Sequence, residues 1–328
     1  MLIKSNIFLI TGAAGFIGFH VSLRLLSLGA RVIGYDNVNE YYDVALKEAR
    51  LNELKQHDCF SFVYADLADT TALHEVFSKY SPPVVIHLAA QAGVRYSLEN
   101  PDAYVQSNLV GFVNILECCR HYNTAHLLYA SSSSVYGASE EIPFSVDDRT
   151  DKPISLYAAT KKSNELFAYT YSHLFGIPTT GMRFFTVYGP WGRPDMAPYL
   201  FLESILQGRP IKVFNNGAMM RDFTYIDDVV NSVISLINNS FALKQKDGQP
   251  PYKVYNIGNN RPEKLLDFIA ILEELTGKKA IMEFLPLQSG DVIATFANID
   301  ELVHDTGIMP ETLLRDGLAK FVTWRVNK

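Results

Sequence analysis

A glycine-rich stretch close to the N-terminus constrains the fold of this chain more than any other feature. Residues 12–18 read GAAGFIG and follow a short apolar run at residues 7–11. An amphipathic segment with helical spacing comes next, and a second apolar run, residues 31–35, ends at Asp36. This order of strand, glycine loop, helix, strand and acid predicts a βαβ unit that binds a dinucleotide. A tight turn in an ordinary α/β protein is the alternative interpretation.

The same motif indicates which dinucleotide is preferred. Glycines permit the tight turn and let backbone N–H groups approach a pyrophosphate at the N-terminus of the following helix. Asp36 lies about 20 residues beyond the loop, where an acidic side chain accepts a hydrogen bond from a ribose 2′-hydroxyl. Its carboxylate would repel a 2′-phosphate, and no basic residue stands among Asn37, Val38 and Asn39. The sequence therefore favours NAD over NADP.

The alternation of apolar runs and helical segments continues along the chain. Further strands are predicted at residues 60–64, 84–90 and 126–130, with a helix at residues 108–119. This pattern implies an α/β fold with a Rossmann-type doubly wound parallel sheet, which binds ligands at the carboxyl ends of its strands. Asp66 follows the third strand as a candidate clamp on adenine, and a helix N-cap is its alternative role. His87, within the fourth strand, is interpreted as a core histidine with satisfied hydrogen bonds.

Composition restricts the class of protein further. A chain of 328 residues has room for one large or two coupled domains, and 48% hydrophobic with 20% charged residues is typical of a globular protein. A net charge of −6 argues against nucleic-acid binding. Residues 1–10 lack the apolar run of a signal peptide or membrane span, so we expect a cytoplasmic protein without membrane attachment. The cysteines, Cys59, Cys118 and Cys119, have no metal-binding spacing, and the adjacent pair is expected to be buried.

A polar segment at residues 129–161 holds the candidate catalytic groups. Four serines occupy positions 131–134, and Tyr157 is followed four residues later by Lys161. Residues four apart lie on one face of a helix, so the phenol and the amine would point the same way, beside a hydroxyl-bearing loop. Such groups can move a proton on and off a hydroxyl group. An exposed helix pair of little consequence is the alternative.

The glycine loop, a strand end with small residues at 88–90, the serine run and the Tyr157–Lys161 pair together resemble the extended short-chain dehydrogenase/reductase family. The resemblance covers essentially the whole chain. Within the family, the chain is similar to NAD-dependent nucleotide-sugar epimerases, and three longer segments look like the UDP-glucuronate 4-epimerases. These segments are residues 91–97 (QAGVRYS), 155–162 (SLYAATKK) and 183–196 (RFFTVYGPWGRPDM).

The resemblance implies a reaction at C4 of a UDP-sugar. Tyr157 would take the proton from the 4-hydroxyl while hydride passes from C4 to NAD, and Ser132 would hydrogen-bond the C4 oxygen. Lys161 and the positive nicotinamide would favour the phenolate. The 4-keto sugar would turn over and take the hydride back on its opposite face, which interconverts UDP-glucuronate and UDP-galacturonate. The residues that the resemblance assigns to NAD are Gly12, Gly15, Phe16, Ile17, Gly18, Asp36, Asn37, Asp66, Leu67, Leu88, Ala89, Ala90, Gln91, Asn108, Tyr157 and Lys161.

The serine run separates possible chemistries. Dehydratases of this family have an Asp-Glu pair where this chain has Ser133 and Ser134, so the acid and base that eliminate water are missing. Short hydroxyls suit the C6 carboxylate of a uronic acid, together with Thr186, where galactose epimerases usually have Asn. Oxidation at C4 makes a β-keto acid. We expect the serines, Thr186 and Arg193 to hold its carboxylate against loss of carbon dioxide.

The resemblance also assigns the uridine diphosphate to side chains of the second half. Arg221 matches the family's diphosphate arginine, whose planar fork suits phosphate oxygens, and a surface ion pair is the alternative. Arg193 or Arg95 would share the diphosphate with it. The other substrate-binding candidates are Asp291 on the ribose side and Val213 and Phe214 at the uracil.

Domain organisation and assembly follow from the same resemblance. Residues 1–177 would form the NAD-binding Rossmann domain, with a later segment near residues 214–258 returning to it. Residues 178–328 would mainly form a smaller mixed α/β domain for the UDP-sugar. Helices after Asn100 and Leu156 form a dimer bundle in relatives, so we expect a homodimer by analogy.

Three alternative functions stay open. The chain could be a 4-epimerase of UDP-glucose or UDP-N-acetylhexosamine. It could be a UDP-glucuronate decarboxylase, which the epimerase-like segment around Thr186 disfavours. It could also be a non-catalytic NAD-sensing binding protein, although such relatives tend to lose the Tyr/Lys pair that is intact here.

Overall fold

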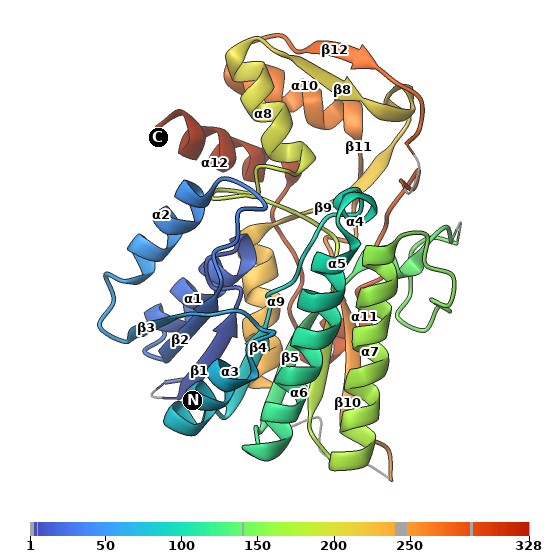
Figure 1. Cartoon of the computed structure of the whole chain (residues 1–328). Helices are drawn as coiled ribbons and strands as arrows, with labels where there is room; N and C mark the ends of the chain where they lie inside the picture. Colours follow the sequence, from blue (N-terminus) through green and yellow to red (C-terminus); the bar gives the residue numbers. More distant parts are fainter. Residues whose placement is uncertain (1–2, 5, 140, 240–247, 289–290, 328) are drawn as a thin grey trace.

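A computed structural model of the chain describes residues 3–4, 6–139, 141–239, 248–288 and 291–327. Its largest element is a seven-stranded sheet in the order β10-β6-β5-β4-β1-β2-β3, with every neighbouring pair parallel (Figure 1). The strand order reverses between β1 and β4, which is where sheets of this kind bind ligands. The strands are β1 (Ile7–Thr11), β2 (Arg31–Asp36), β3 (Phe60–Tyr64), β4 (Val84–His87), β5 (His126–Ser132), β6 (Thr179–Phe184) and β10 (Tyr252–Ile257).

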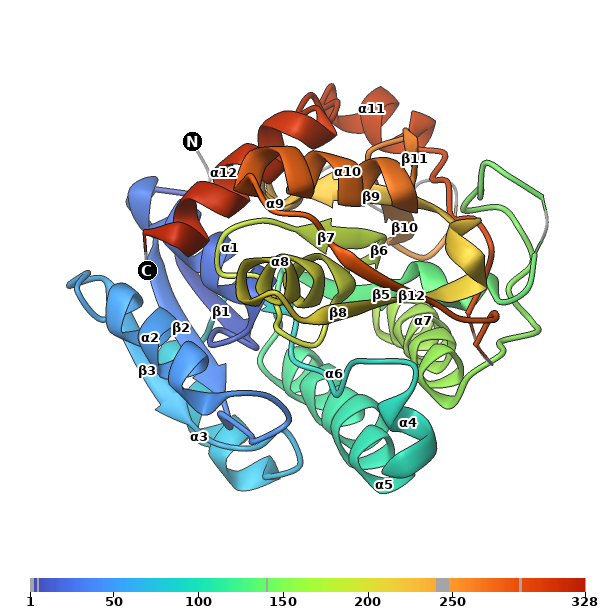
Figure 2. The same ribbon diagram turned by 90° about the horizontal axis from the view of Figure 1, so that it is seen from above.

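Helices cover both faces of the sheet because successive strand residues are apolar on both sides. In β1, Phe8 and Ile10 belong to the core on one face, whereas Leu9 belongs to the core on the other. The first face is covered by α1 (Phe16–Ser27), α2 (Val44–Leu54) and α9 (Ile226–Asn238), and the second by α3 (Thr70–Tyr80), α6 (Gly111–His121) and α7 (Leu156–Phe175) (Figure 2). Cys118 and Cys119 of α6 are buried, as predicted.

The connection between β4 and α6 is irregular and contains one cofactor-site candidate. Two short helices, α4 (Tyr96–Glu99) and α5 (Pro101–Tyr104), lead into a π-helical turn, Val105–Val110, that continues as α6. The helix predicted at residues 108–119 therefore begins inside this turn, which contains Asn108. Such turns are frequent at functional sites.

A smaller α/β region lies above the carboxyl ends of the parallel strands (Figure 1). It shares one core with the large sheet, since Phe268 belongs to the same buried cluster as Phe8. A three-stranded sheet joins β7 (Thr186–Tyr188), β9 (Met220–Tyr225) and β11 (Pro262–Lys264), and β8 (Pro210–Val213) pairs in parallel with β12 (Ile281–Phe284). The helices of this region are α8 (Ala197–Gln207), α10 (Leu265–Thr276) and α12 (Leu314–Val326), while α11 (Asp300–Thr306) packs beside α9 and β10.

The predicted fold class, a Rossmann-type α/β sheet with a smaller mixed α/β region, is confirmed. The predicted limit at residue 177 differs from the structure, because β6 completes the large sheet beyond it, whereas β10 lies in the segment near residues 214–258 that was expected to return to the sheet. Residues 214–225 lie in the smaller region, and the chain returns to the sheet with α9 and β10. No helix within the described ranges is long and apolar enough to cross a lipid bilayer.

Candidate active site

The turn between β1 and α1 leaves no room for side chains at two of its glycines. Gly12 has a φ of +75°, and a Cβ there would lie 2.7 Å from the backbone nitrogen of Ala89, just beyond β4. A Cβ on Gly18 would lie 2.1 Å from the carbonyl oxygen of Gly12. The backbone is thereby pressed against β4 and against the first turn of α1. We call residues 12–18 the glycine cradle, and its position at a helix N-terminus suits a pyrophosphate.

Asp36, at the end of β2, is fastened to the glycine cradle. Its Oδ2 accepts a hydrogen bond from the backbone nitrogen of Ala14 at 3.0 Å, and its Oδ1 accepts one from Val38 at 2.8 Å. Burial raises the pKa of this carboxyl, and the two hydrogen bonds and the positive charge of Lys47 oppose that rise. The carboxylate is therefore fixed at the rim of the cradle, where a ribose contact requires it.

Asp66 lies beside the end of β2 rather than at a helix terminus. Nδ2 of Asn37 donates to its Oδ2 at 2.6 Å, and the backbone nitrogen of Ala68 donates to its Oδ1 at 2.8 Å. Asp69 caps α3 instead, because its carboxylate accepts from the nitrogen of Ala72 at 3.0 Å. The N-cap interpretation of Asp66 is therefore wrong.

Two buried polar side chains brace the end of β4. Oδ1 of Asn108 accepts from the nitrogen of Gln91 at 2.8 Å, and its Nδ2 donates to the carbonyl of Gln91 and to Oγ1 of Thr160 in α7, both at 3.0 Å. Nδ1 of His87 shares a hydrogen bond with Oγ1 of Thr11 at 2.8 Å, and burial lowers the pKa of His87 to about 3. His87 is thus a neutral core residue.

One cavity runs from the glycine cradle across the carboxyl ends of the strands to the smaller region. It is lined by every catalytic and cofactor residue named from the sequence except Asn108, which supports the wall from behind. Of the substrate candidates, Ser133, Ser134, Thr186 and Arg193 line it. The other five lie outside it and are Arg95, Val213, Phe214, Arg221 and Asp291.

The first turns of α7 present Tyr157 and Lys161 to this cavity. Ser155 caps the helix, since its Oγ accepts a hydrogen bond from the nitrogen of Ala158 at 3.1 Å. Lys161 is only 2% exposed, and its Nζ donates to the carbonyl oxygen of Ala130 in β5 at 2.9 Å. Burial lowers the pKa of Lys161 to about 8, which brings the amine close to titration at neutral pH.

β5 ends at Ser132, and a 3₁₀ turn continues the serine run. Oγ of Ser132 donates to Oγ of Ser134 at 3.1 Å and accepts from the nitrogen of Ser134 at 3.2 Å. Burial raises the pKa of Tyr157, whereas hydrogen bonding with Ser132 and the positive charge of Arg193 lower it. The sequence predicts this electrostatic role for Lys161 together with the nicotinamide, and that stays a prediction. The structure adds Arg193 as a cation that lowers the pKa of the phenol.

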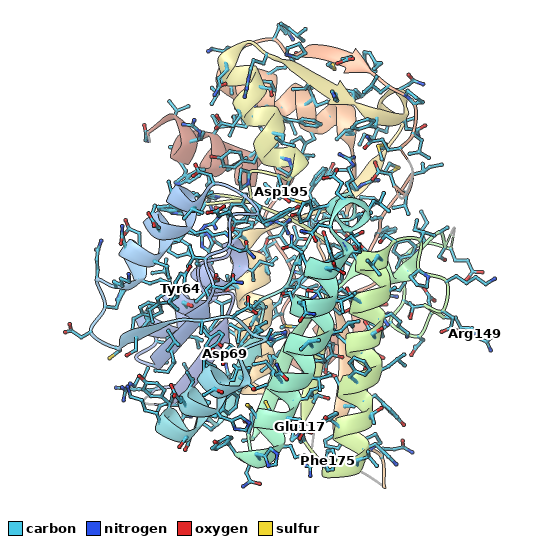
Figure 3. All side chains as sticks on the ribbon, viewed as in Figure 1. Tyr64, Asp69, Glu117, Arg149, Phe175 and Asp195 are labelled. Atoms are coloured by element: carbon cyan, nitrogen blue, oxygen red, sulfur yellow. The ribbon has the colours of Figure 1, made fainter. Side chains whose placement is uncertain are left out.

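Arg193, in the loop after β7, reaches the cavity with a fixed orientation. Its Nε donates to Oδ1 of Asp195 at 3.1 Å and its Nη2 to Oδ2 at 2.5 Å, while the hydroxyl of Tyr41 donates to the same Oδ2 at 3.1 Å. Burial would raise the pKa of Asp195, but the pairing with Arg193 and Tyr41 holds it below its usual range. Figure 3 shows Asp195 at the junction between the large sheet and the smaller region.

Three further substrate candidates form a cluster outside the cavity. The guanidinium of Arg95 lies 5.0 Å from the ring centre of Phe214, and its Nη2 lies 3.3 Å from Oδ2 of Asp291. This outer cluster joins the loop after β4 to the segments that follow β8 and β12. Its members were named separately from the sequence, and the structure brings them together.

Arg221, in β9, is held by backbone carbonyls. Its Nη1 donates to Met220 at 2.8 Å and to Ile293 at 3.0 Å, and its Nη2 donates to Val292 at 2.7 Å. Within the part of the chain that the structure describes, the surface ion pair considered as the alternative for Arg221 does not form. Val213 is fully buried, and its carbonyl oxygen accepts a hydrogen bond from the nitrogen of Leu285 at 2.9 Å, so this residue offers no exposed surface to a ligand.

Comparisons with known proteins agree with this geometry over most of the chain. Residues 8–258 match the NAD dependent epimerase/dehydratase family. The chain belongs to this family. It is 53% identical to Protein CapI of Staphylococcus aureus over 325 residues, which cover 96% of this chain and 97% of that protein.

Two further relatives of this epimerase/dehydratase family member have more specific names. The chain is 49% identical over 327 residues to the probable UDP-glucuronate 4-epimerase of Rhizobium meliloti, with 97% of this chain and 96% of that protein covered. The crystal structure of UDP-glucuronic acid 4-epimerase from Bacillus cereus, in complex with UDP-glucuronic acid and NAD, is similar with a TM-score of 0.89. That chain is 34% identical, and the match covers 98% of this chain and 99% of that one.

This family member also contains two buried cations in α2 that the sequence analysis missed. Lys47 lines the cavity, and its Nζ donates to the carbonyl oxygen of Asn39 at 2.5 Å. Arg50 is fully buried, and its guanidinium donates to the carbonyl oxygens of Ala14 at 2.9 Å and Trp191 at 2.6 Å. In the sequence both cations stand in a helical segment rich in charge, which indicates a solvated face rather than a binding site.

Proposed function

We propose that the protein is an NAD-dependent 4-epimerase that interconverts UDP-glucuronate and UDP-galacturonate. The observation that supports this most is that Tyr157, Ser132 and Arg193 meet in one cavity that is continuous with the glycine cradle. The reaction needs side chains that exchange a proton with the substrate hydroxyl, a cation for the substrate carboxylate and a binding site for the dinucleotide. The near full-length similarity to proteins named as UDP-glucuronate 4-epimerases supports the same substrate.

The cradle fits the cofactor, because a Cβ at Gly12 or Gly18 would collide with the backbone and push the turn out of shape. Bound NAD would supply the acceptor, and later the donor, of the C4 hydride. Backbone N–H groups at the start of α1 would hold its pyrophosphate, and Asp36 would accept from the adenosine ribose. Asp66 and Leu67 would flank the adenine at the outer end of the cavity.

Proton transfer is assigned to Tyr157. Its phenolate would remove the proton from the 4-hydroxyl, and the phenol would return it to the C4 oxygen after the sugar has turned over. Ser132 would hold that oxygen through a hydrogen bond. Lys161 lies one helical turn from Tyr157, and an amine with a pKa of about 8 can exchange protons near neutral pH.

The sugar carboxylate would face Ser133, Ser134, Thr186 and Arg193. A 4-keto uronate loses carbon dioxide when the breaking bond aligns with the ketone π system. Hydrogen bonds that keep the carboxylate out of this alignment suppress that side reaction. Arg193 suits the task because Asp195 and Tyr41 fix its guanidinium before the substrate arrives.

The uridine diphosphate would lie between Arg221 and the outer cluster of Arg95, Phe214 and Asp291. The charged groups of this cluster are paired with each other. Binding would therefore replace the Arg95–Asp291 ion pair with contacts to the nucleotide, which are stronger when they involve phosphate and a planar guanidinium.

We also propose a homodimer formed through α6 and α7. Val110, at the end of the π-helical turn before α6, is 38% exposed, while Leu166 and Leu174 of α7 are 56% and 63% exposed. The molar mass measured by light scattering would be twice that of the chain. A Leu166→Glu variant should lower it, and an unchanged monomeric mass for the wild type would contradict the proposal.

The function is tested by incubating the purified protein with UDP-glucuronate, without added NAD, and separating the products. UDP-galacturonate is the expected product, and UDP-pentose would indicate a decarboxylase. Conversion of UDP-glucose or UDP-N-acetylglucosamine in place of UDP-glucuronate would shift the substrate assignment. A Tyr157→Phe variant should fold and retain NAD but lose turnover by roughly 100- to 10,000-fold, the range expected for removal of a general base.

A further inference from the structure

A buried ion pair lies directly behind the serine run. Nε and Nη2 of Arg183 donate to Oε1 and Oε2 of Glu165 at 2.8 and 2.9 Å, and the two side chains are 4% and 3% exposed. Glu165 follows Lys161 by four residues on α7, so it lies on the helix face of Tyr157 and Lys161. Arg183 lies on β6 as the cross-strand neighbour of Ser131. None of the chemistry described above uses this pair.

The pair holds both ends of the serine run. At the first residue of the run, Oγ of Ser131 donates to Oε1 of Glu165 at 2.7 Å. After the run, Nη1 of Arg183 donates to the hydroxyl of Tyr136 at 3.0 Å, and that hydroxyl donates to Oδ1 of Asn256 in β10 at 2.6 Å. Residues 132–134 therefore lie between two anchor residues, Ser131 and Tyr136, and both anchors are hydrogen-bonded to the Glu165–Arg183 ion pair. Glu165 belongs to α7, the helix that also contains Tyr157.

Stability alone gives no reason for such a pair. The desolvation of two buried charges roughly offsets their attraction, and apolar residues of similar volume are often as stable. A bidentate carboxylate–guanidinium pair fixes orientation as well as distance. The orientation matters here because Ser132 acts directly on the Tyr157 phenol, and both belong to segments that this pair joins.

We propose that Glu165 and Arg183 are positioning residues that hold the serine run at the distance from Tyr157 that proton transfer needs. The inference rests on the proposed 4-epimerase function. Neither residue touches the substrate in this proposal. They act through Ser131 and Tyr136, so weakening either anchor should disturb the protonation of Tyr157 while the cofactor site stays intact.

Two mild variants test the anchors. Ser131→Ala removes only the hydroxyl bonded to Glu165. Tyr136→Phe removes only the hydroxyl that bonds Arg183 and Asn256, and keeps the ring stacked with its centre 4.6 Å from that of Phe144. The control is Ser232→Ala, which removes a buried hydroxyl that donates to the Asp228 carbonyl in α9 at 2.8 Å.

The measurements are NAD content, thermal unfolding and the pH profile of kcat with UDP-glucuronate. We expect kcat at neutral pH to fall roughly five- to tenfold in each anchor variant, because each loses one hydrogen bond to the ion pair, and we expect the acidic limb of the kcat profile to move to higher pH. NAD content should match the wild type, and Ser232→Ala should leave the limb in place. Ser131→Thr, which keeps the hydroxyl, should restore the profile.

An unmoved limb in both anchor variants would overturn the inference, as would an equal shift in the Ser232→Ala control. The double variant Glu165→Met/Arg183→Met removes both charges together and so avoids leaving one unpaired. If it folds and retains the wild-type pH profile, the ion pair has no positioning role. A wild-type protein that converts no UDP-uronate would instead overturn the proposed function, which keeps the two failures distinct.

Discussion

Replacing Gly18 with alanine tests the glycine cradle most directly. Alanine favours helices over glycine by about 1 kcal/mol, so a loss must come from the collision of the added methyl group. That Cβ would lie 2.1 Å from the Gly12 oxygen, whereas ordinary contact begins at 3.4 Å. The first turn of α1 must therefore move away from Gly12 by roughly 1 Å, and overpacking of this size costs about 1–3 kcal/mol.

The shift should reach the cofactor, because it displaces the N–H groups aimed at the pyrophosphate. Loss of two charge-assisted hydrogen bonds, at about 1.5 kcal/mol each, corresponds to roughly a hundredfold weaker NAD binding. The assay compares NAD released from the purified proteins and NAD affinity by calorimetry. Gly317→Ala in α12 is the matched control, since its Cβ would lie 2.1 Å from the Tyr188 hydroxyl. It should lower the melting temperature but retain NAD. Wild-type affinity in Gly18→Ala, or equal loss of NAD in the control, would refute the reasoning.

Three further changes have defined outcomes. Thr186→Ala should raise the fraction of UDP-pentose among the products, and a fraction equal to that of the wild type would remove Thr186 from control of decarboxylation. Asp36→Ala loses the acceptor for Ala14 and Val38, so NAD should bind roughly tenfold more weakly and the preference over NADP should shrink in a calorimetric titration. Lys161 has its pKa lowered from 10.5 to about 8, so cofactor-free protein should gain stability as pH rises from 8 towards 10.5, by at most about 3 kcal/mol. Urea unfolding should show this gain in the wild type and not in Lys161→Met.

Much of the sheet and of the cavity follows from local sequence patterns. Apolar runs at short intervals predict parallel strands, and ligands of such sheets lie at the carboxyl ends of the strands. Asp36, the serine run and the Tyr157–Lys161 pair each stand at such an end or at the helix start beside it. Their meeting in one cavity is therefore a consequence of topology.

Local sequence patterns do not predict contacts between segments that are far apart along the chain. Tyr41 meets Asp195 across 154 positions, and no local pattern connects them. Asp66 shows a different limit. Asp66 and Asp69 are three residues apart and either could be the N-cap of the same helix, and only the three-dimensional course of the chain determines that Asp69 takes this role. Arg193 lowers the pKa of Tyr157, and the sequence does not predict this either, because electrostatic effects depend on distance in space and not on separation along the chain.

The hydrogen bonds made by the guanidinium of Arg50 affect how substrate specificity can diverge among relatives. It donates to the carbonyl oxygens of Ala14 in the glycine cradle and of Trp191 and Gly192 in the loop after β7, which also contains Arg193. Since every residue type has a backbone carbonyl, side chains in that loop can be exchanged without loss of the hydrogen bonds to Arg50. Chimeras that combine the N-terminal half of one relative with the C-terminal half of another should therefore fold when the loop follows the same backbone path in both parents, even where its residues differ. They should fail when the loop lengths differ, however similar the residues.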